Sequence, residues 1–265
     1  MAAWQTAGLL NQGEKMMLIA GNWKMNGLAG EAAALARQLG DAVSGEPASS
    51  AAPMVVFPPA LHIGLIAPLL AESGISLGGQ DCHAAESGAH TGDIAAEMLA
   101  DLGCDWVLVG HSERRTDHGE TDSAIRAKAE AGIRAGLRVM LCVGETLDQR
   151  QGGAAETVVA EQLLQSLPAK MDASGLAIAY EPVWAIGSGL VPSMEEIADM
   201  HQLIRKTLGQ HGKGLEKTPI LYGGSVKPSN ATAILGLEGV DGVLVGGASL
   251  KAEDFLAIRA AASVS

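Results

Sequence analysis

Eight short apolar runs, rich in β-branched residues, recur along this chain, and nearly every one ends in glycine, polar and charged residues. The runs begin at Met17, Met54, Ile75, Trp106, Arg138, Leu176, Ile220 and Gly242. Roughly 20 to 45 residues separate their starts, which leaves room for a helical crossover each time. Runs that are apolar throughout indicate parallel strands buried on both faces. We therefore predict an α/β fold, a (β/α)8 barrel of eight parallel strands surrounded by helices, with its active site at the carboxyl ends of the strands.

The unbroken alternation of strands and helices favours one domain. We expect residues 17–265 to form a single catalytic barrel domain and residues 1–16 to form a short, loosely ordered extension. A net charge of −12 argues against nucleic acid and acidic membranes as partners. No apolar stretch is long enough to span a membrane, and the three cysteines, Cys82, Cys104 and Cys142, lack C-x-x-C spacing. We interpret them as reduced core thiols of a cytoplasmic protein.

The first and fourth runs end in residues that suit a reaction site. Lys24 is either a solvated surface charge or a cation directed into the barrel mouth, where Asn22 could orient it toward a phosphate or a developing oxyanion. Ser112 can open a helix that places N–H groups near His111, lowers its pKa and favours its neutral form. A neutral histidine can donate a hydrogen bond to a carbonyl. We interpret the other histidines weighed in this way as structural, namely His62, His83, His118, His201 and His211.

The sixth run ends in a carboxylate followed by an apolar segment. Pro182 keeps Glu181 out of helical geometry, and a carboxylate at a strand end is a candidate general base. The segment after it contains Pro182, Val183, Trp184, Ala185, Ile186, Gly187 and Ser188. Proline and glycine supply two hinges around a tip whose Trp and Ile we expect to be exposed to solvent. This composition predicts a lid that excludes water, although an ordinary connecting loop is the alternative.

Glycine pairs follow the last two runs, in Gly223-Gly224-Ser225 and in Gly246-Gly247. Barrels of this class bind phosphate in these two loops, through backbone N–H groups and a short helix N-terminus. The predicted site therefore holds a phosphate cradle, a base, a neutral hydrogen-bond donor and a cation. We expect no metal ligands and no cofactor, because the base and the donors suffice for an enolisation.

Five segments then match the motifs of one family in order. They are AGNWKMN at 20–26, VGHSERR at 109–115, YEPVWAIGSG at 180–189, YGGSV at 222–226 and VGGASL at 245–250. With these motifs the chain resembles the triosephosphate isomerases, which are TIM barrels, from Met17 to the C-terminal helix. That family interconverts dihydroxyacetone phosphate and D-glyceraldehyde 3-phosphate in glycolysis, gluconeogenesis and the pentose shunt.

The resemblance implies catalytic roles for the strand-end residues. Glu181 would move the proton between two substrate carbons through an enediolate. His111 would polarise the carbonyl, while Lys24 and Asn22 would stabilise the developing negative charge. Glu113 has two interpretations, as a proton relay or as the salt-bridge partner of Lys24.

The resemblance also implies a set of substrate contacts. Gly187 of the closed lid would donate its N–H to the phosphate, and Ser225, Gly246 and Gly247 would supply the remaining donors. Leu244 would line the pocket. Ser188 replaces a more common threonine in the family's lid hinge, and the lost methyl group would loosen that hinge slightly.

The family is normally a homodimer, in which the loop after the third strand enters the partner subunit. That loop is 80–93 here. Thr91 is expected to reach the partner's Asn22 and Glu113, and Asp93 is expected to pair with the partner's Arg114. The family more often has glutamate at the last position, so this ion pair would be longer or bridged by water.

Two alternative functions are weighed against this one. A related isomerase of four-carbon sugar phosphates would keep the same lysine, histidine and glutamate, and would differ in pocket depth near Ile186 and Leu244. A non-catalytic binding protein could use the same barrel. The presence of Lys24, His111 and Glu181 together argues against the second alternative.

Overall fold

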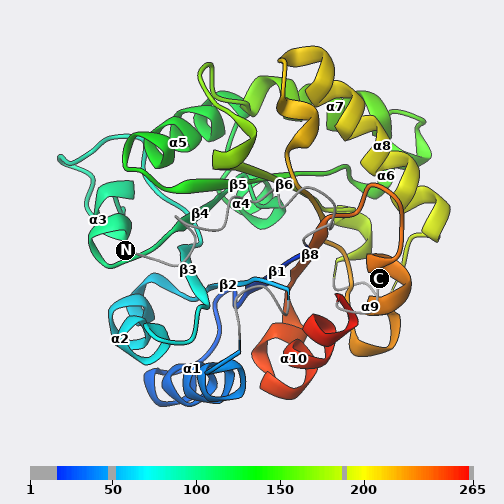
Figure 1. Ribbon diagram of the computed structural model, residues 1–265. Helices are drawn as coiled ribbons and strands as arrows, with labels where there is room; N and C mark the ends of the chain where they lie inside the picture. The colour runs from blue at the N-terminus through cyan, green and yellow to red at the C-terminus, as the bar shows by residue number, and fades with distance from the viewer. Residues whose placement is uncertain (1–16, 47–51, 187–189, 263–265) are drawn as a thin grey trace.

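Eight parallel strands close into a barrel at the centre of the molecule (Figure 1). The computed structural model describes residues 17–46, 52–186 and 190–262, so the extension expected at 1–16 lies outside the described residues. Each strand pairs with its neighbours in sequence, and the first strand pairs with the last. The strands are β1 (Leu18–Asn22), β2 (Met54–Phe57), β3 (Ser76–Gly79), β4 (Trp106–Val109), β5 (Arg138–Val143), β6 (Leu176–Tyr180), β7 (Ile220–Tyr222) and β8 (Gly242–Val245). Each lies within one of the eight apolar runs, which confirms the predicted fold class.

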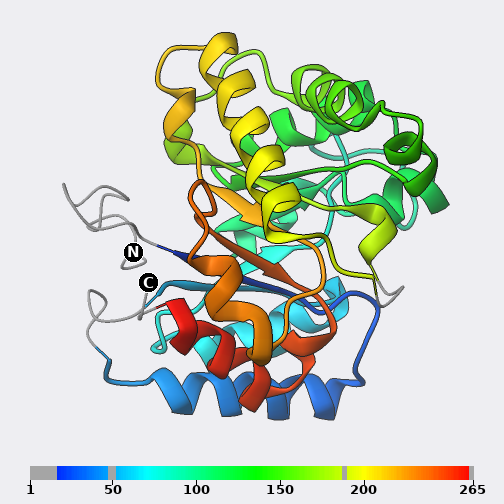
Figure 2. The ribbon, with the colours of Figure 1, turned by 90° about the vertical axis from the view of Figure 1, so that its right-hand side faces the viewer.

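Helices lie around the barrel, and Figure 2 shows α1 and α8 on opposite sides of the strands. They are α1 (Ala29–Val43), α2 (Ala60–Leu70), α3 (Ala96–Asp101), α4 (Ser112–Asp117), α5 (Asp122–Arg134), α6 (Leu147–Gln151), α7 (Ala155–Ser166), α8 (Met194–His211), α9 (Pro228–Leu235) and α10 (Ala252–Ala261). Short 3-10 turns are η2 (Ala173–Gly175), η3 (Val183–Ala185), η4 (Leu215–Lys217) and η5 (Gly247–Leu250). Among these described helices, none combines the length and the apolar character that crossing a membrane requires.

Local sequence signals begin several of these helices. Ser193 and Glu196 form a reciprocal capping box at α8, in which each side chain accepts the other residue's backbone N–H. Thr121 accepts the N–H of Ala124 at the start of α5, and Pro228 occupies the first turn of α9. These caps satisfy N–H groups that have no partner within a helix, and so they fix where each crossover returns toward the barrel.

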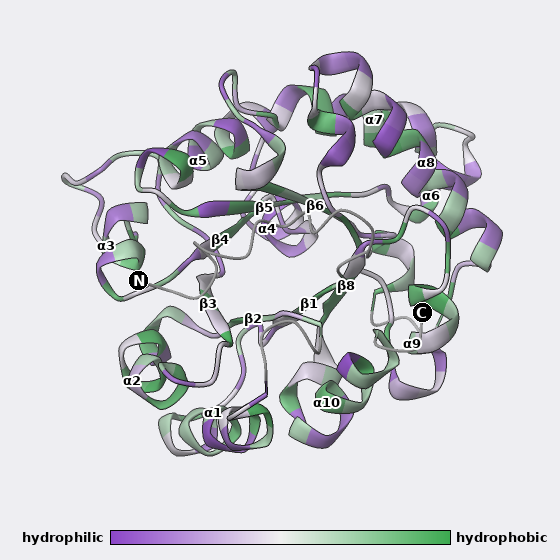
Figure 3. Cartoon of the chain, in the orientation of Figure 1, coloured by the Kyte–Doolittle hydropathy of each residue, from purple (hydrophilic) through white to green (hydrophobic). Residues whose placement is uncertain are grey.

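The core consists of two layers separated by the strands. Side chains that alternate along the strands fill the barrel interior, among them Leu18, Val55, Trp106 and Met140. The residues between them face the helices and pack with the apolar helix faces. Figure 3 accordingly shows hydrophobic strands inside a ring of helices of mixed polarity. Burial on both faces explains why the sequence runs are continuous rather than alternating.

The cysteines belong to this core. Cys82, Cys104 and Cys142 are buried free thiols, which confirms their interpretation as core residues. Burial raises the pKa of Cys82 and of Cys104 to about 12, because desolvation disfavours the thiolate.

Closure of the barrel depends on one glycine. Gly242 begins β8 at a φ of 150°, and a Cβ atom added there would lie 2.0 Å from the carbonyl oxygen of Leu18. Only glycine allows the backbones of β1 and β8 to approach this closely. The register then runs from Leu18 opposite Gly242 to Gly21 opposite Val245.

Candidate active site

A pocket of about 810 Å³ opens at the carboxyl ends of the strands, above the packed interior. It brings together nine residues that the sequence predicts for one site. They are Asn22, Lys24, His111, Glu181, Ile186, Ser225, Leu244, Gly246 and Gly247. Because they come from five different strand ends and the loops that follow them, the closed barrel is what makes them neighbours.

Lys24 has an unusual backbone that two side chains hold in place. Its φ is 52°, and among the described residues it is the one non-glycine with a positive φ. The Oδ1 atom of Asn22 accepts the Lys24 N–H at 2.9 Å, and Nε2 of Gln80 donates to the Lys24 carbonyl at 2.9 Å. Gln80 also donates to the carbonyl of Phe57 at 2.8 Å. The strained conformation is thus fixed from β1 and from the end of β3, and it aims the lysine side chain into the pocket.

The Lys24 ammonium contacts a carboxylate at the start of α4. Its Nζ lies 2.6 Å from Oε1 of Glu113, whose side chain is 50% exposed. The other oxygen of Glu113 lies 3.6 Å from Nδ1 of His111. Of the two interpretations for Glu113, this geometry favours the salt-bridge partner of Lys24.

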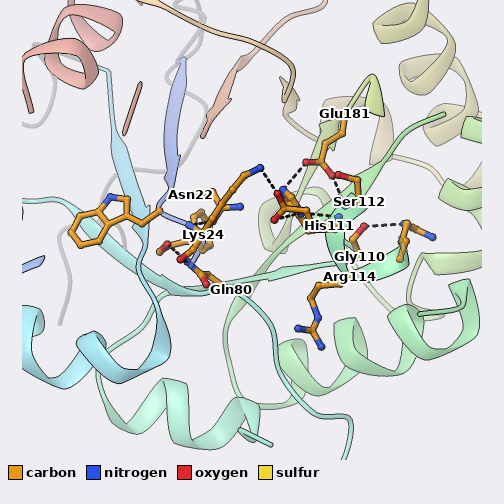
Figure 4. Close-up of polar contacts among 12 residues, drawn as sticks. Asn22, Lys24, Gln80, Gly110, His111, Ser112, Arg114 and Glu181 are labelled. Atoms are coloured by element: carbon orange, nitrogen blue, oxygen red, sulfur yellow. Dashed lines mark hydrogen bonds and ion pairs between the residues drawn. The ribbon is translucent and has the colours of Figure 1, made fainter. Parts of the chain in front are cut away.

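The helix α4 begins at Ser112, where the sequence predicts a helix start, and His111 is its N-cap. Its Nδ1 accepts the backbone N–H of Glu113 at 3.2 Å, so the proton of the neutral ring belongs on Nε2. Nε2 lies 2.9 Å from Oε1 of Glu181 (Figure 4). The helix N-terminus therefore selects the tautomer that presents an N–H to the pocket.

Glu181 is a buried carboxylate with both oxygens engaged. Its side chain is 2% exposed, and its Oε2 accepts the N–H of Ser112 at 2.9 Å while Oε1 contacts His111. Burial by itself would raise the pKa of Glu181, but His111, the Ser112 N–H and Lys24 lower it below its usual range. The carboxylate is therefore held in its basic form. Sequence reasoning missed the N–H of Ser112 as a partner, because it depends on how α4 meets β6.

The pKa of His111 differs from the sequence expectation. Burial and the nearby Lys24 cation lower it, but the Glu181 carboxylate outweighs them, and the net direction is upward. The expectation considered the helix N-terminus alone and omitted a carboxylate at hydrogen-bond distance. The raised pKa therefore belongs to the arrangement in which Glu181 contacts the ring.

The lid segment begins with the 3-10 turn η3. Trp184 is half-buried rather than exposed to solvent, since its Nε1 donates to Oε1 of Glu145 at 2.8 Å. Ile186 is also half-buried and lines the pocket, so the expectation of a solvent-exposed tip is wrong for both residues. The predicted lid residues Gly187 and Ser188 lie outside the described residues.

Glu145 is a buried anchor that sequence reasoning missed. It is fully buried, and its Oε1 also accepts the hydroxyl of Tyr180 at 3.1 Å and contacts Nη1 of Arg150 at 3.0 Å. It follows the glycine that ends the fifth run, which is the same strand-end signal that identified Lys24 and Glu181. Its contacts fix the start of the lid segment through Trp184.

The opposite wall of the pocket includes the two glycine-containing loops that follow β7 and β8. Gly247 begins the turn η5, and Ser249 donates its hydroxyl to the Gly246 carbonyl at 2.7 Å. Asn230 of α9 donates to the carbonyl of Ser225 at 3.1 Å. A Cβ atom on Gly247 would meet nothing within 4 Å, whereas one on Gly246 would lie 3.5 Å from Cε of Lys24. The two glycine loops therefore leave space for an anionic group next to the lysine.

The residues predicted at a subunit contact lie apart from the pocket lining. Thr91 and Asp93 are exposed on the loop after β3. The two ends of this loop are joined by a hydrogen bond, which the N–H of His83 donates to the carbonyl of Ile94. Arg114 contacts two carboxylates of its own chain, Asp81 at 2.9 Å and Glu120 at 2.6 Å. A guanidinium has five N–H donors, so these contacts leave Arg114 with donors for a further carboxylate.

Acid–base side chains facing a glycine-lined wall at the mouth of a closed barrel place this protein among the (β/α)8-barrel enzymes. Comparison with known proteins then narrows the class. The family model described as triosephosphate isomerase matches residues 17–262. The chain belongs to the triosephosphate isomerase family, and this confirms the resemblance drawn from the five motifs.

Known triosephosphate isomerases are similar in sequence to this protein over nearly the whole chain. A triosephosphate isomerase of Afipia carboxidovorans is 53% identical over 248 residues, which cover 92% of this chain and 96% of that protein. One of Acidiphilium cryptum is 53% identical over 255 residues, covering 93% and 98%. The crystal structure of triosephosphate isomerase from Bartonella henselae matches with a TM-score of 0.84 at 41% identity, covering 92% of this chain and 98% of that one.

Proposed function

We propose that this protein interconverts dihydroxyacetone phosphate and D-glyceraldehyde 3-phosphate at the described pocket. One observation carries the proposal. The ionised carboxylate of Glu181, the Nε2 of His111 and the ammonium of Lys24 lie in one pocket of a chain that belongs to the triosephosphate isomerase family. A base, a hydrogen-bond donor and a cation are the groups that an enolisation requires.

In the proposed reaction Glu181 takes a proton from the substrate carbon beside the carbonyl. The electron pair of that C–H bond moves toward the carbonyl oxygen, which receives a hydrogen bond from Nε2 of His111, and the enediolate forms. Lys24 and Asn22 stabilise its negative charge. His111 gives its Nε2 proton to the former carbonyl oxygen and takes the hydroxyl proton of the other enediolate oxygen, which becomes the new carbonyl. Glu181 returns its proton to the neighbouring carbon, so atoms and electrons balance without a further reactant.

This reaction requires Glu181 to leave its present partners. His111 and the N–H of Ser112 hold its two oxygens in their present direction, so the carboxylate turns to bring an oxygen to the substrate carbon. When the carboxylate turns toward the substrate, His111 loses the stronger of the two carboxylates that raise its pKa, and Glu113 remains as the weaker one. The Glu113 N–H at Nδ1 and the Lys24 cation remain, and both favour the neutral ring. The ring is then suited to donate rather than to carry charge.

The phosphate is proposed to lie against Ser225, Gly246 and Gly247, with Leu244 lining the pocket beside it. These residues line the wall opposite Glu181, and the space beside Gly247 is open. Closure of the lid over the substrate would exclude water, strengthen the electrostatic contacts and protect the enediolate from losing phosphate. Gly187 is proposed to complete the phosphate contacts from the lid.

We also propose that the protein is a homodimer. Three apolar side chains near the carboxyl ends of β1 and β2 are strongly exposed, Met25 at 96%, Leu61 at 91% and Leu28 at 77%. They lie at the same end of the barrel as the loop after β3. Association with a second copy would cover this apolar surface, with Thr91 and Asp93 reaching the partner. Sedimentation equilibrium of the wild type and of Thr91→Arg tests this, since the variant is expected to be monomeric.

A cytoplasmic location is proposed on chemical grounds. All three cysteines are buried free thiols, which is typical of proteins from a reducing compartment, and the proposed substrates are phosphorylated metabolites. Fractionation of cells from the source organism, with the protein followed by antibody, checks this location.

The proposed activity is tested by a coupled assay with D-glyceraldehyde 3-phosphate, run beside a four-carbon ketose phosphate. We expect fast turnover of the triose phosphate, loss of turnover in Glu181→Gln and little turnover of the longer sugar. Preference for the four-carbon substrate would keep the proton chemistry and reject the triose assignment. Turnover of neither by a folded wild type would contradict the proposed function altogether.

A further inference from the structure

The backbone that carries Glu181 rests on the end of β5. The N–H of Glu181 donates to the carbonyl of Val143 at 2.8 Å, and the N–H of Val183 donates to the carbonyl of Glu145 at 3.1 Å. Gly144 lies between these two contacts. Residues 143–145 therefore form a support under residues 181–183, which include the proposed base and the first turn of the lid.

Gly144 contacts Glu181 so closely that no side chain fits between them. A Cβ atom added to Gly144 would lie 1.7 Å from the carbonyl oxygen of Glu181. The backbone fixes the position of both the added Cβ atom and the carbonyl oxygen, so no rotamer change relieves that overlap. Any displacement of Gly144 is therefore transmitted to the main chain of Glu181.

One side chain from the helical layer holds this glycine. Gln162 of α7 accepts the Gly144 N–H through Oε1 at 2.8 Å and donates from Nε2 to the Gly144 carbonyl at 3.0 Å. A carboxamide carries its donor and its acceptor on separate atoms, so it can pair with the N–H and the C=O of a single residue. We call this pair of hydrogen bonds the Gln162 clamp.

Packing does not replace the clamp, because there is free space beside it. A cavity of about 90 Å³ is lined by Gly144, Gln162, Glu181 and Val183, together with residues of α4 and the start of α6. A backbone segment that borders a cavity has no side-chain packing on that side to hold it in place. The position of Gly144 therefore depends on the two hydrogen bonds.

We infer that Gln162 is a positioning residue for the proposed isomerase reaction, acting through Gly144 on the backbone of the base Glu181. It touches neither the main pocket nor any reacting atom. The inference rests on the proposed function, since Glu181 is its target. Proton transfer is sensitive to displacement of the base on the scale of about 1 Å, so loss of the clamp acts mainly on kcat.

The test compares Gln162→Met, which keeps the side-chain length and loses both hydrogen bonds, with Gln165→Met. Gln165 is exposed on the same helix and provides the matched control. We expect Gln162→Met to lower kcat by about tenfold or more while KM stays within about twofold, and Gln165→Met to match the wild type. Folding is checked by circular dichroism and thermal unfolding.

A double variant separates positioning from a general loss of stability. In Glu181→Asp the carboxylate is already displaced, so adding Gln162→Met is expected to cost less in kcat than it does in the wild type. The inference would be overturned if Gln162→Met lowered kcat by the same factor in the wild type and in Glu181→Asp. A lower unfolding temperature with an unchanged kcat per folded molecule would also overturn it, since that result shows a structural role only.

Two further variants keep the inference testable if Gln162→Met does not fold. Gln162→Glu retains an acceptor for the Gly144 N–H and loses the donor, so kcat is expected to fall, whereas a wild-type kcat would contradict the clamp. Gly144→Ala moves the Glu181 backbone directly and is expected to cost more in kcat than Gln162→Glu. An inactive wild type would instead contradict the proposed function, which keeps the two failures distinct.

Discussion

The two walls of the pocket are built in different ways. On one wall, side-chain contacts link the ends of β1, β4 and β6, because Lys24 pairs with Glu113 at the start of α4 and the neighbouring His111 contacts Glu181. On the other wall, the loops after β7 and β8 present glycines to the pocket, and the space beside Gly247 is open. The properties of the first wall are set by the positions of a few charged atoms. The shape of the second wall is set by the path of the main chain. We therefore expect substitutions on the first wall to lower mainly the rate of the chemical step. Substitutions on the second wall should mainly weaken substrate binding.

The largest effect is expected for Glu181→Asp. The substitution withdraws the carboxylate by one methylene group while keeping its charge, and displacement of a base by about 1 Å can cost about a hundredfold in rate. We predict a loss of kcat of at least about that size, with circular dichroism unchanged. Steady-state kinetics measure it. A near-normal kcat would show that the first wall does not depend on the position of this side chain.

Lys24→Ala should affect both binding and rate. The Lys24 side chain extends from the first wall toward Gly246, since its Cε would lie 3.5 Å from a Cβ atom added there. Removing one electrostatic stabiliser of this kind costs about 10²–10³ in rate. We therefore expect kcat to fall and KM to rise, while the exposed control Lys206→Ala behaves as the wild type. Unchanged kinetic constants in Lys24→Ala would reduce this residue to a surface charge.

Ser225→Ala and Gly247→Ala probe the second wall and should have smaller effects. The proposed phosphate contacts there are backbone N–H groups, and a Cβ atom at Gly247 meets nothing within 4 Å. We expect KM to rise by less than about tenfold with kcat retained, the pattern for loss of binding shared by the ground and transition states. If either variant loses as much kcat as Lys24→Ala, the division between the walls is wrong.

The smallest expected effect is the contribution of Glu181 to the pH dependence of the free energy of unfolding. The pKa of Glu181 in the folded chain lies below the ordinary glutamate value of 4.5. Between the folded and unfolded pKa values the unfolded chain binds more protons, so stability rises with pH there. The contribution of Glu181 is complete above pH 4.5 and is lost as the pH falls through the folded pKa. Urea unfolding should show the wild type losing stability relative to Glu181→Gln below pH 4.5, and a constant difference would contradict the lowered pKa.

Much of this architecture was predictable, because its signals are local. Each strand lies within a continuous apolar run, and residues such as Lys24, His111 and Glu181 stand where those runs end. A parallel barrel brings all strand ends to one side, so the runs alone predict that these residues share a pocket. The tautomer of His111 was also predictable from the sequence, because the N–H that its Nδ1 accepts belongs to Glu113, only two residues away.

Contacts between distant segments were not predictable in this way. Gln162 lies in the middle of a helix and Gln80 directly after a strand, and nothing in their neighbourhoods distinguishes them from surface glutamines. The burial of Trp184 depends on Glu145, which belongs to another strand end. The upward pKa shift of His111 likewise depends on Glu181, 70 residues away in the sequence by their numbers. Such features follow from how elements meet, which no local pattern encodes.

The pairing of β1 with β8 makes the molecule a ring of units with no first or last member. Leu18 lies opposite Gly242, so the described chain returns to where it started. If its ends were joined by a linker and the chain were opened between two other units, all eight strand pairings would remain available. The fold thus constrains the cyclic order of its units. It does not determine which unit is synthesised first, because that depends on the order in the gene. Different starting points would change the order in which the strands emerge during synthesis while leaving the same pocket at the end.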